Sequence, residues 1–553
     1  MASSVVFAAA LLAAFVSTST QCEVRARTRA GWVCGAKRLA QDGSQYASFR
    51  GVPYAKQPLG ELRFQELQPL DPWIEDFNAT SEGPACPNYD IYFGSLVQPQ
   101  SISEACIHAN IHVPIDALPN TQTGASTNCT GGLPILVFIH AGGWVCGSGD
   151  ADFNGPEYLV SRGVIIITFN YRLDFLGFLS LNTSKIPGNN GLRDMVTLLR
   201  WVQANAAYFG GNPADVTLAG LSAGSGSVHL LTLSPAAVGL FNRAFLMSGV
   251  AVQSFYSASP VYAQQVAALF LSALNITSTD YDEVHDQLVE LPIDVLKAAS
   301  RVVLDQTGLT SFVPVVETPY ANFTTILSEY PETLQANGNG KHIPLVIGFT
   351  SDECEMIRPR LSELNVVATI QENPLIGLSP ALLYSLPSNV TAEMATKVLA
   401  RYFNGTPTMD EYIKLCTESL LQYPAIKLAQ ARAASGGAPA FLYKYAYEAE
   451  YSVIKEALNL TYSGAGHTED FNRIFKVNSW PVPASVADEA MTGWMTDILE
   501  TFIKYNTPSR DGCWAAASPA LEYNYIAGPA TDFGAMSDYD QEMVHFFETL
   551  ADV

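Results

Sequence analysis

Residues 220–224 read Gly-Leu-Ser-Ala-Gly and place a serine where it could act as a nucleophile. A short β-rich run, 215–219, precedes this motif, and residues 223–231 can begin a helix. A serine on a tight turn between strand and helix must hold a strained backbone angle, so glycines two positions away avoid a collision. The N–H of Ala223 then points where an oxyanion would form. The motif therefore predicts a nucleophile elbow at Ser222.

A serine nucleophile needs a general base. Two histidines, His467 and His545, lie well downstream of Ser222 with many acidic residues before them. The segment 464–470 reads Gly-Ala-Gly-His-Thr-Glu-Asp, and its small residues let a loop swing the imidazole of His467 over the serine. His545 lies in a helical pattern, so we predict a structural role for it.

The base in turn needs a carboxylate that orients it, and such an acid should follow a strand of the sheet. The apolar run 343–348 predicts a strand, and Asp352 and Glu353 come shortly after it. Glu353 fits the position of the acid, and Asp352 is the alternative.

Continuous apolar runs must form the sheet that positions these residues. The run 133–139 ends directly before His140. Such β-branched runs, separated by helical segments, indicate a parallel sheet covered on both faces. No repeat of 20–50 residues and no flexible linker divides the chain, so we predict one large α/β domain over 22–553. The other predicted strands of this sheet are 164–169, 244–247, 343–348 and 441–445.

The chain resembles the type-B carboxylesterase and cholinesterase family of α/β-hydrolases, from about residue 25 to 530. This resemblance implies a large, mostly parallel, twisted central sheet with helices on both faces, and hydrolysis of a small hydrophobic carboxylic ester through an acyl-enzyme. It rests on stretches at 49–55 (FRGVPYA), 103–106 (SEAC), 170–173 (NYRL), 176–178 (LGF), 188–194 (GNNGLRD), 199–203 (LRWVQ), 209–213 (FGGNP) and 491–494 (MTGW).

The resemblance also favours Glu353 over Asp352, because 352–354 looks like the family's strand-end D-E-G motif with Cys354 in place of glycine. It thus implies a triad of Ser222, Glu353 and His467.

Residues 140–143, His-Ala-Gly-Gly, look like the family's H-G-G-G loop. By this likeness Gly142 and Gly143 donate N–H groups to an oxyanion, together with Ala223, while Ala141 stands where the first glycine usually is.

Two ion pairs, Arg63 with Glu104 and Arg172 with Asp194, and a disulfide are also implied by the resemblance. The implied disulfide joins Cys86 and Cys106.

The N-terminus has the pattern of a secreted protein. An apolar run over residues 5–16, followed by small residues, predicts a signal peptide over 1–21. No other apolar run is long enough to cross a membrane, so we expect a secreted, extracellular protein without a membrane anchor. Eight N-x-S/T sequons are candidate glycosylation sites, at Asn78, Asn128, Asn182, Asn275, Asn322, Asn389, Asn404 and Asn459.

Nine cysteines allow at most four disulfides and leave one thiol over. Cys22 and Cys34 flank a predicted hairpin and are candidates to pair. No C-x₂-C spacing occurs, so we predict no metal site and no cofactor. The sequence does not indicate partners for Cys129, Cys146, Cys354, Cys416 and Cys513.

The formal net charge is −23, from 30 basic and 53 acidic residues. This excess of negative charge argues against nucleic acid and anionic membrane surfaces as partners.

The likeness extends to secreted insect carboxylesterases. Leu221 stands where cholinesterases have Glu, and the loop 87–105 lacks the Trp that binds choline there, so acylcholine is not the expected substrate. Juvenile-hormone esterases have Gln before the serine and an Asp-Gln pair, where this chain has Leu221 and Asp194-Met195. We therefore expect a general or odorant-acetate carboxylesterase, with a juvenile-hormone esterase as the alternative. A third hypothesis, from another class, is a non-catalytic binding or adhesion relative.

Overall fold

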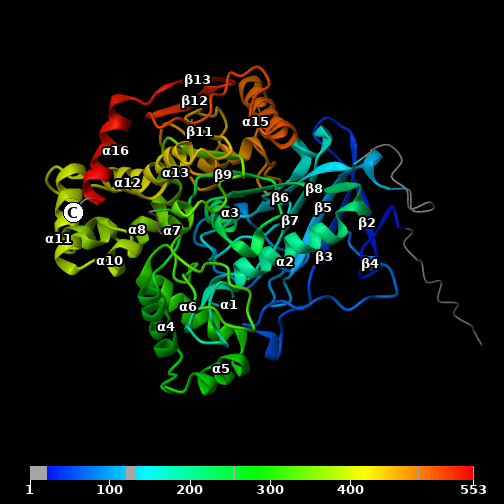
Figure 1. Cartoon of the computed structure of the whole chain (residues 1–553), viewed down its shortest axis with the longest axis horizontal. Helices are drawn as coiled ribbons and strands as arrows, with labels where there is room; N and C mark the ends of the chain where they lie inside the picture. Colours follow the sequence, from blue (N-terminus) through cyan, green and yellow to red (C-terminus); the bar gives the residue numbers. More distant parts are fainter. Residues whose placement is uncertain (1–21, 120–130, 253–255, 484, 552–553) are drawn as a thin grey trace, which may run out of the picture.

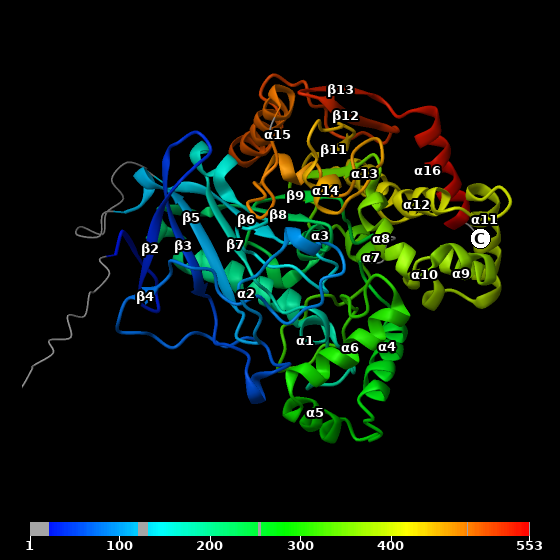
Figure 2. The same cartoon turned by 180° about the vertical axis from the view of Figure 1, so that it is seen from behind.

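The computed structural model describes residues 22–119, 131–252, 256–483 and 485–551. One large sheet runs through them in the order β1-β2-β3-β5-β7-β6-β8-β9-β10-β11-β12-β13, and β4 pairs with β2 (Figures 1 and 2). The strands are β1 (Val24–Arg27), β2 (Trp32–Leu39), β3 (Gln45–Pro53), β4 (Phe77–Asn78), β5 (His108–Pro114), β6 (Leu133–Ile139), β7 (Ile165–Phe169), β8 (Gly211–Leu221), β9 (Arg243–Met247), β10 (Leu345–Thr350), β11 (Ala440–Tyr445), β12 (Glu522–Gly528) and β13 (Ala530–Ala535).

The sheet is parallel through its centre and antiparallel at both margins. Neighbouring strands from β7 to β12 all pair in parallel. Strands β1, β2, β3, β5 and β7 pair antiparallel, as does β13 with β12. The outer strands β1, β2 and β13 are partly exposed, whereas central strands such as β6 and β7 are buried on both faces and read as continuous apolar runs.

Alternate residues of the central strands face two separate apolar cores. On β6, Ile135, Val137 and Ile139 belong to one core, while Leu136 and Phe138 belong to the other. This alternation follows from the two-residue period of a strand, and it shows that helices cover both faces. The first core packs against α2 (Asn190–Asn205) and α3 (Ala223–Leu233), and the second packs against α15 (Val486–Tyr505).

The remaining helices gather into two groups at one side of the sheet (Figure 1). One group contains α4 (Pro260–Ala273), α5 (Tyr281–Glu290) and α6 (Ile293–Thr307), inserted between β9 and β10. The other contains α8 (Arg358–Glu363), α9 (Val366–Glu372), α10 (Pro380–Ser385), α11 (Ser388–Tyr402), α12 (Met409–Thr417), α13 (Tyr423–Ala434) and the C-terminal α16 (Asp538–Ala551). Shorter helices are α1 (Asp174–Phe178), α7 (Pro331–Ala336) and α14 (Val453–Ala457).

Both ion pairs implied by the resemblance are present. Arg63 and Glu104 form a bidentate pair at 2.7 Å for each bond. Arg172 and Asp194 form a buried bidentate pair at 2.8 and 2.6 Å. Because Asp194 lies near the start of α2 and Arg172 follows β7, the second pair fixes this helix against the end of the central sheet.

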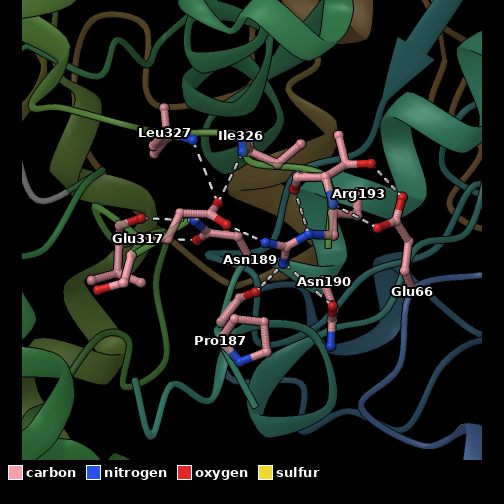
Figure 3. Close-up of polar contacts among 12 residues, drawn as sticks. Glu66, Pro187, Asn189, Asn190, Arg193, Glu317, Ile326 and Leu327 are labelled. Atoms are coloured by element: carbon pink, nitrogen blue, oxygen red, sulfur yellow. Dashed lines mark hydrogen bonds and ion pairs between the residues drawn. The ribbon is translucent and has the colours of Figure 1, made fainter. Parts of the chain in front are cut away.

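A third buried ion pair, between Arg193 and Glu317, was not predicted (Figure 3). The guanidinium of Arg193 also donates to the carbonyl of Thr324 at 2.8 Å. Glu317 accepts the side-chain amide of Asn189 at 2.6 Å and the backbone N–H of Ile326 at 3.1 Å. This network ties the start of α2 to the loop that follows α6.

Candidate active site

Ser222 lies between the end of β8 at Leu221 and the start of α3 at Ala223. Its backbone φ is +57°, a conformation that non-glycine residues rarely adopt. The turn is held from both sides, because the Ser222 N–H donates to the Met247 carbonyl at 2.8 Å and the Gly226 N–H donates to the Ser222 carbonyl at 2.9 Å. The strained serine is thus fixed by β9 on one side and by the first turn of α3 on the other.

The two glycines of the motif have a steric cause. A Cβ on Gly220 would lie 2.5 Å from the carbonyl carbon of Gly224, and a Cβ on Gly224 would lie 2.2 Å from the carbonyl oxygen of Ile139. Only glycine lets the start of α3 pack directly on the ends of β8 and β6. This close packing brings Ser222 next to the loop that follows β6.

His467 and Glu353 are joined by a short hydrogen bond. Glu353 Oε2 lies 2.6 Å from His467 Nδ1. The other carboxylate oxygen of Glu353 accepts the backbone N–H of Thr350 at 2.7 Å, and the side chain is fully buried. These contacts hold the carboxylate at the end of β10, so the imidazole keeps Nδ1 toward Glu353 and leaves Nε2 for another partner.

The alternative residues take other positions. The carboxylate of Asp352 accepts the hydroxyl of Ser351 at 2.6 Å. His545 lies on α16, as its helical pattern predicted, and its side chain is exposed. Neither side chain lines the cavity that contains Ser222.

The loop after β6 carries both glycines that were predicted to donate to an oxyanion. Gly142 and Gly143 have φ of +118° and +63°, and a Cβ on Gly142 would lie 2.1 Å from the Cys146 carbonyl oxygen. The Gly142 carbonyl accepts the N–H groups of Val145 at 2.9 Å and Cys146 at 3.1 Å. The Gly143 carbonyl accepts the hydroxyl of Thr310 at 3.0 Å. With both carbonyls engaged in this way, the loop has a fixed backbone.

His140 supports this loop as a neutral ring. Burial lowers its pKa to about 4, and Nδ1 lies 2.8 Å from the Ala141 carbonyl oxygen. The imidazole stacks on Tyr171 with ring centroids 4.4 Å apart. The histidine of the motif therefore packs under the loop at neutral pH.

A single cavity of about 60 Å³ brings the predicted residues together. Ser222, His467, Glu353, Gly142 and Gly143 all line it. Ala223 provides the first N–H of α3 beside Ser222, where the N-terminus of a helix favours negative charge. The other side chains of the wall are almost all apolar or aromatic: Tyr92, Phe93, Tyr256, Leu309, Cys354, Met356, Ile357, Cys416, Leu420 and Leu421.

A family model described as the carboxylesterase family matches residues 21–544. The chain belongs to this family. The carboxylesterase is 47% identical over 539 residues to the juvenile hormone esterase of Heliothis virescens. The alignment covers 95% of this chain and 94% of that protein. It is 30% identical over 513 residues to esterase FE4 of Myzus persicae, with 90% and 87% covered.

A solved structure extends this similarity to three dimensions. The crystal structure of juvenile hormone esterase from Manduca sexta, with OTFP covalently attached, matches with a TM-score of 0.92 and 48% identity, covering 96% of this chain and 100% of that chain. The carboxylesterase thus has the α/β-hydrolase fold and is a carboxylic ester hydrolase.

The carboxylesterase contains three disulfides in its described residues. Cys86–Cys106 and Cys22–Cys34 are the two pairs that the sequence suggested. The third, Cys354–Cys416, was missed because 62 positions separate its two cysteines. Cys146 is a buried free thiol and Cys513 an exposed one, while Cys129 lies outside the described residues.

Tyr256 was also missed by sequence reasoning. Its ring lines the cavity, and its hydroxyl donates to the Ser248 carbonyl at 3.2 Å and lies within hydrogen-bonding reach of Ser222. Burial raises the pKa of Tyr256 above its ordinary value, so the phenol stays neutral. No motif in the sequence marks this tyrosine, because α3 and the segment after β9 meet only in the folded chain.

The surface of the carboxylesterase carries seven of the eight sequon asparagines, and all seven are exposed. The eighth, Asn128, and the predicted signal peptide, 1–21, lie outside the described residues. Within the described ranges, no helix is both long and apolar enough to cross a bilayer. The same ranges contain no cluster of side chains suited to hold a metal ion.

Proposed function

We propose that this carboxylesterase uses Ser222 as its nucleophile, His467 as general base and acid, and Glu353 as the carboxylate that orients the base. The hydrogen bond of 2.6 Å between Glu353 and His467, in the cavity that Ser222 lines, is the observation that carries the proposal. A catalytic triad of this kind requires a buried carboxylate, an imidazole on a loop and a serine on a strained turn. Glu353, His467 and Ser222 have these properties.

In the acylation step, Ser222 Oγ attacks the ester carbonyl carbon and His467 accepts the hydroxyl proton. The tetrahedral oxyanion is stabilised by the N–H groups of Gly142, Gly143 and Ala223. As the intermediate collapses, the bond between the carbonyl carbon and the alkoxy oxygen breaks, and His467 returns the proton to the departing alcohol. The acyl group remains on Ser222.

In the deacylation step, water attacks the acyl carbon while His467 takes one of its protons. The carboxylic acid leaves, and the proton returns to Ser222 Oγ. Glu353 keeps the imidazole in one tautomer throughout and stabilises the imidazolium in each step.

The substrate best supported is the juvenile hormone ester, which revises the order of our two sequence-based hypotheses. Identity to two juvenile hormone esterases is 47% and 48%, against 30% to esterase FE4. Leu221 and the pair Asp194-Met195 had argued against this substrate. However, all three side chains are fully buried, and none is among the residues that line the cavity. A general carboxylesterase acting on acetates is the second candidate, supported by the similarity to esterase FE4.

The domain boundaries and the extracellular location form part of the same proposal. A signal peptide over 1–21 would precede one carboxylesterase domain over 22–553, and the protein would be secreted. The three disulfides suit an oxidising compartment, and the seven exposed sequons offer sites for glycans.

The test combines active-site labelling with substrate comparison. A fluorophosphonate should label Ser222, and the S222A variant should be neither labelled nor active. The enzyme should prefer the methyl ester of a long terpenoid acid to short acetates at low substrate concentration. Fast acetate turnover without this preference would favour the general carboxylesterase. An unlabelled, inactive wild-type protein would leave the non-catalytic hypothesis.

A further inference from the structure

The proposed catalytic acid lies directly beside a cross-link. Cys354 follows Glu353 in the chain, and its disulfide to Cys416 joins the segment after β10 to the end of α12. Both half-cystines are buried, and both line the cavity that contains Ser222. The disulfide is therefore part of the wall that a substrate would contact.

Hydrogen bonds reinforce this cross-link on both sides of Glu353. The N–H of Cys354 donates to Thr417 Oγ1 at 3.0 Å, and the Gln422 side-chain amide donates to the carbonyls of Thr350 and Ser351 at 3.0 and 3.1 Å. The carboxyl end of β10 is thus tied to residues at both ends of one segment. We refer to Cys354, Cys416, Thr417 and Gln422 as the clamp.

The segment held by the clamp also shapes the cavity. Residues Glu418–Gln422 form a π-helical turn, a rare conformation that is frequent at functional sites. Leu420 and Leu421 of this turn line the cavity. The turn is fixed from behind, because the buried carboxylate of Glu418 accepts the hydroxyls of Tyr402 and Tyr539, each at 2.5 Å.

The same cross-link holds a second part of the wall. Met356 and Ile357 follow Cys354 within the 3₁₀ turn Glu353–Ile357, and both line the cavity. The disulfide therefore sets the distance between two apolar wall segments, 356–357 and 420–421. Because both segments line the cavity with apolar side chains that pack closely against a bound group, small changes in this distance alter which acyl or alcohol groups can enter.

We propose that the clamp determines the substrate specificity of the esterase site, by holding these two wall segments at a spacing that admits an acyl group with an unbranched α-carbon and rejects one with a quaternary α-carbon. The inference rests on the proposed function, since it takes the cavity at Ser222 as the place where the ester binds. Cys354 and Cys416 act as specificity-determining residues, and Thr417 and Gln422 act as positioning residues.

The test compares two isomeric esters, p-nitrophenyl hexanoate and p-nitrophenyl 2,2-dimethylbutanoate. In C354A/C416A we expect the ratio of kcat/KM for the linear ester to that for the branched ester to fall about tenfold from wild type, because a looser wall tolerates branching at the α-carbon. The matched control C22A/C34A removes a disulfide in the β1–β2 hairpin, and its ratio should equal that of wild type. An unchanged ratio in C354A/C416A, or an equal fall in the control, would overturn the proposal.

A second pair of variants keeps the disulfide intact. T417V removes the acceptor for the Cys354 N–H at nearly constant volume, whereas T417S keeps it. We expect T417V to lower the ratio of kcat/KM for the linear ester to that for the branched ester, and T417S to keep this ratio near that of wild type. The same ratio in both variants would contradict the positioning role. Fluorophosphonate labelling of Ser222 separates the two proposals. If wild type is not labelled, the proposed function is contradicted. If wild type is labelled but no variant changes the ratio of kcat/KM for the two esters, only the proposed role of the clamp is contradicted.

Discussion

The carboxylate of Glu353 and the imidazole of His467 meet at 2.6 Å, although 114 positions separate them in the chain. We expect E353Q to lower kcat about 10⁴-fold, because an amide no longer fixes the tautomer or stabilises the imidazolium. The control is D352N, which alters the adjacent carboxylate that bonds to Ser351 instead, and it should retain wild-type turnover. Steady-state kinetics of both variants checks this assignment, and a larger loss in D352N would reverse it.

The contact of Gly224 with the end of β6 predicts a steric effect. In G224A the new methyl group would collide with the Ile139 carbonyl, 2.2 Å away, so we expect loss of esterase activity and of soluble protein. In G493A, inside α15, the methyl group meets nothing within 4 Å, and alanine should stabilise the helix by about 0.5–1 kcal/mol. Thermal unfolding and ester turnover of the two variants test this contrast. An active G224A enzyme would show that α3 can shift.

The buried pair Arg193–Glu317 predicts a large energetic cost when one partner is removed (Figure 3). We expect R193M to lower the free energy of unfolding by about 3–5 kcal/mol, because Glu317 would remain buried without its counter-charge. R25M breaks the half-exposed pair with Asp76 and should cost about 0–1 kcal/mol. Urea unfolding measures both values. An equal loss in the free energy of unfolding for both variants would mean that the buried pair stabilises the protein no more than the half-exposed pair does.

Asp174 predicts a pH-dependent stability. Burial raises its pKa to about 7, against about 3.9 in an unfolded chain, so the folded protein binds more protons between these values. Stability from this group is therefore complete below about pH 4 and falls as pH rises toward about 7. D174N keeps an acceptor for the Ser300 hydroxyl and tolerates the φ of +50°, so it should be the more stable protein above about pH 7.

Thermal unfolding across this pH range checks the prediction. The difference in stability between D174N and wild type should grow with pH between about 4 and 7 and then level off. A difference that stays constant with pH would contradict it. S300A gives a control, since it removes the hydroxyl donor but leaves the titrating carboxyl in place.

The sequence by itself determined the features that depend on local sterics and on apolar patterns. Gly220 and Gly224 around Ser222 required a tight turn whatever lay elsewhere, and the run 133–139 is β6 with the same bounds. The outermost strands other than the predicted N-terminal hairpin were less apparent, because a partly exposed strand such as β13 lacks the continuous apolar run of a buried strand.

Only the tertiary structure decided features that depend on which distant segments meet. Asp352 and Glu353 are neighbours in the chain, and the residues alone left both open, since the path of β10 decides which carboxylate faces His467. Cys354 and Cys416 pair because α12 returns to the end of β10. Such contacts depend on topology rather than on local preference, and two cysteines 62 positions apart carry no pattern that links them.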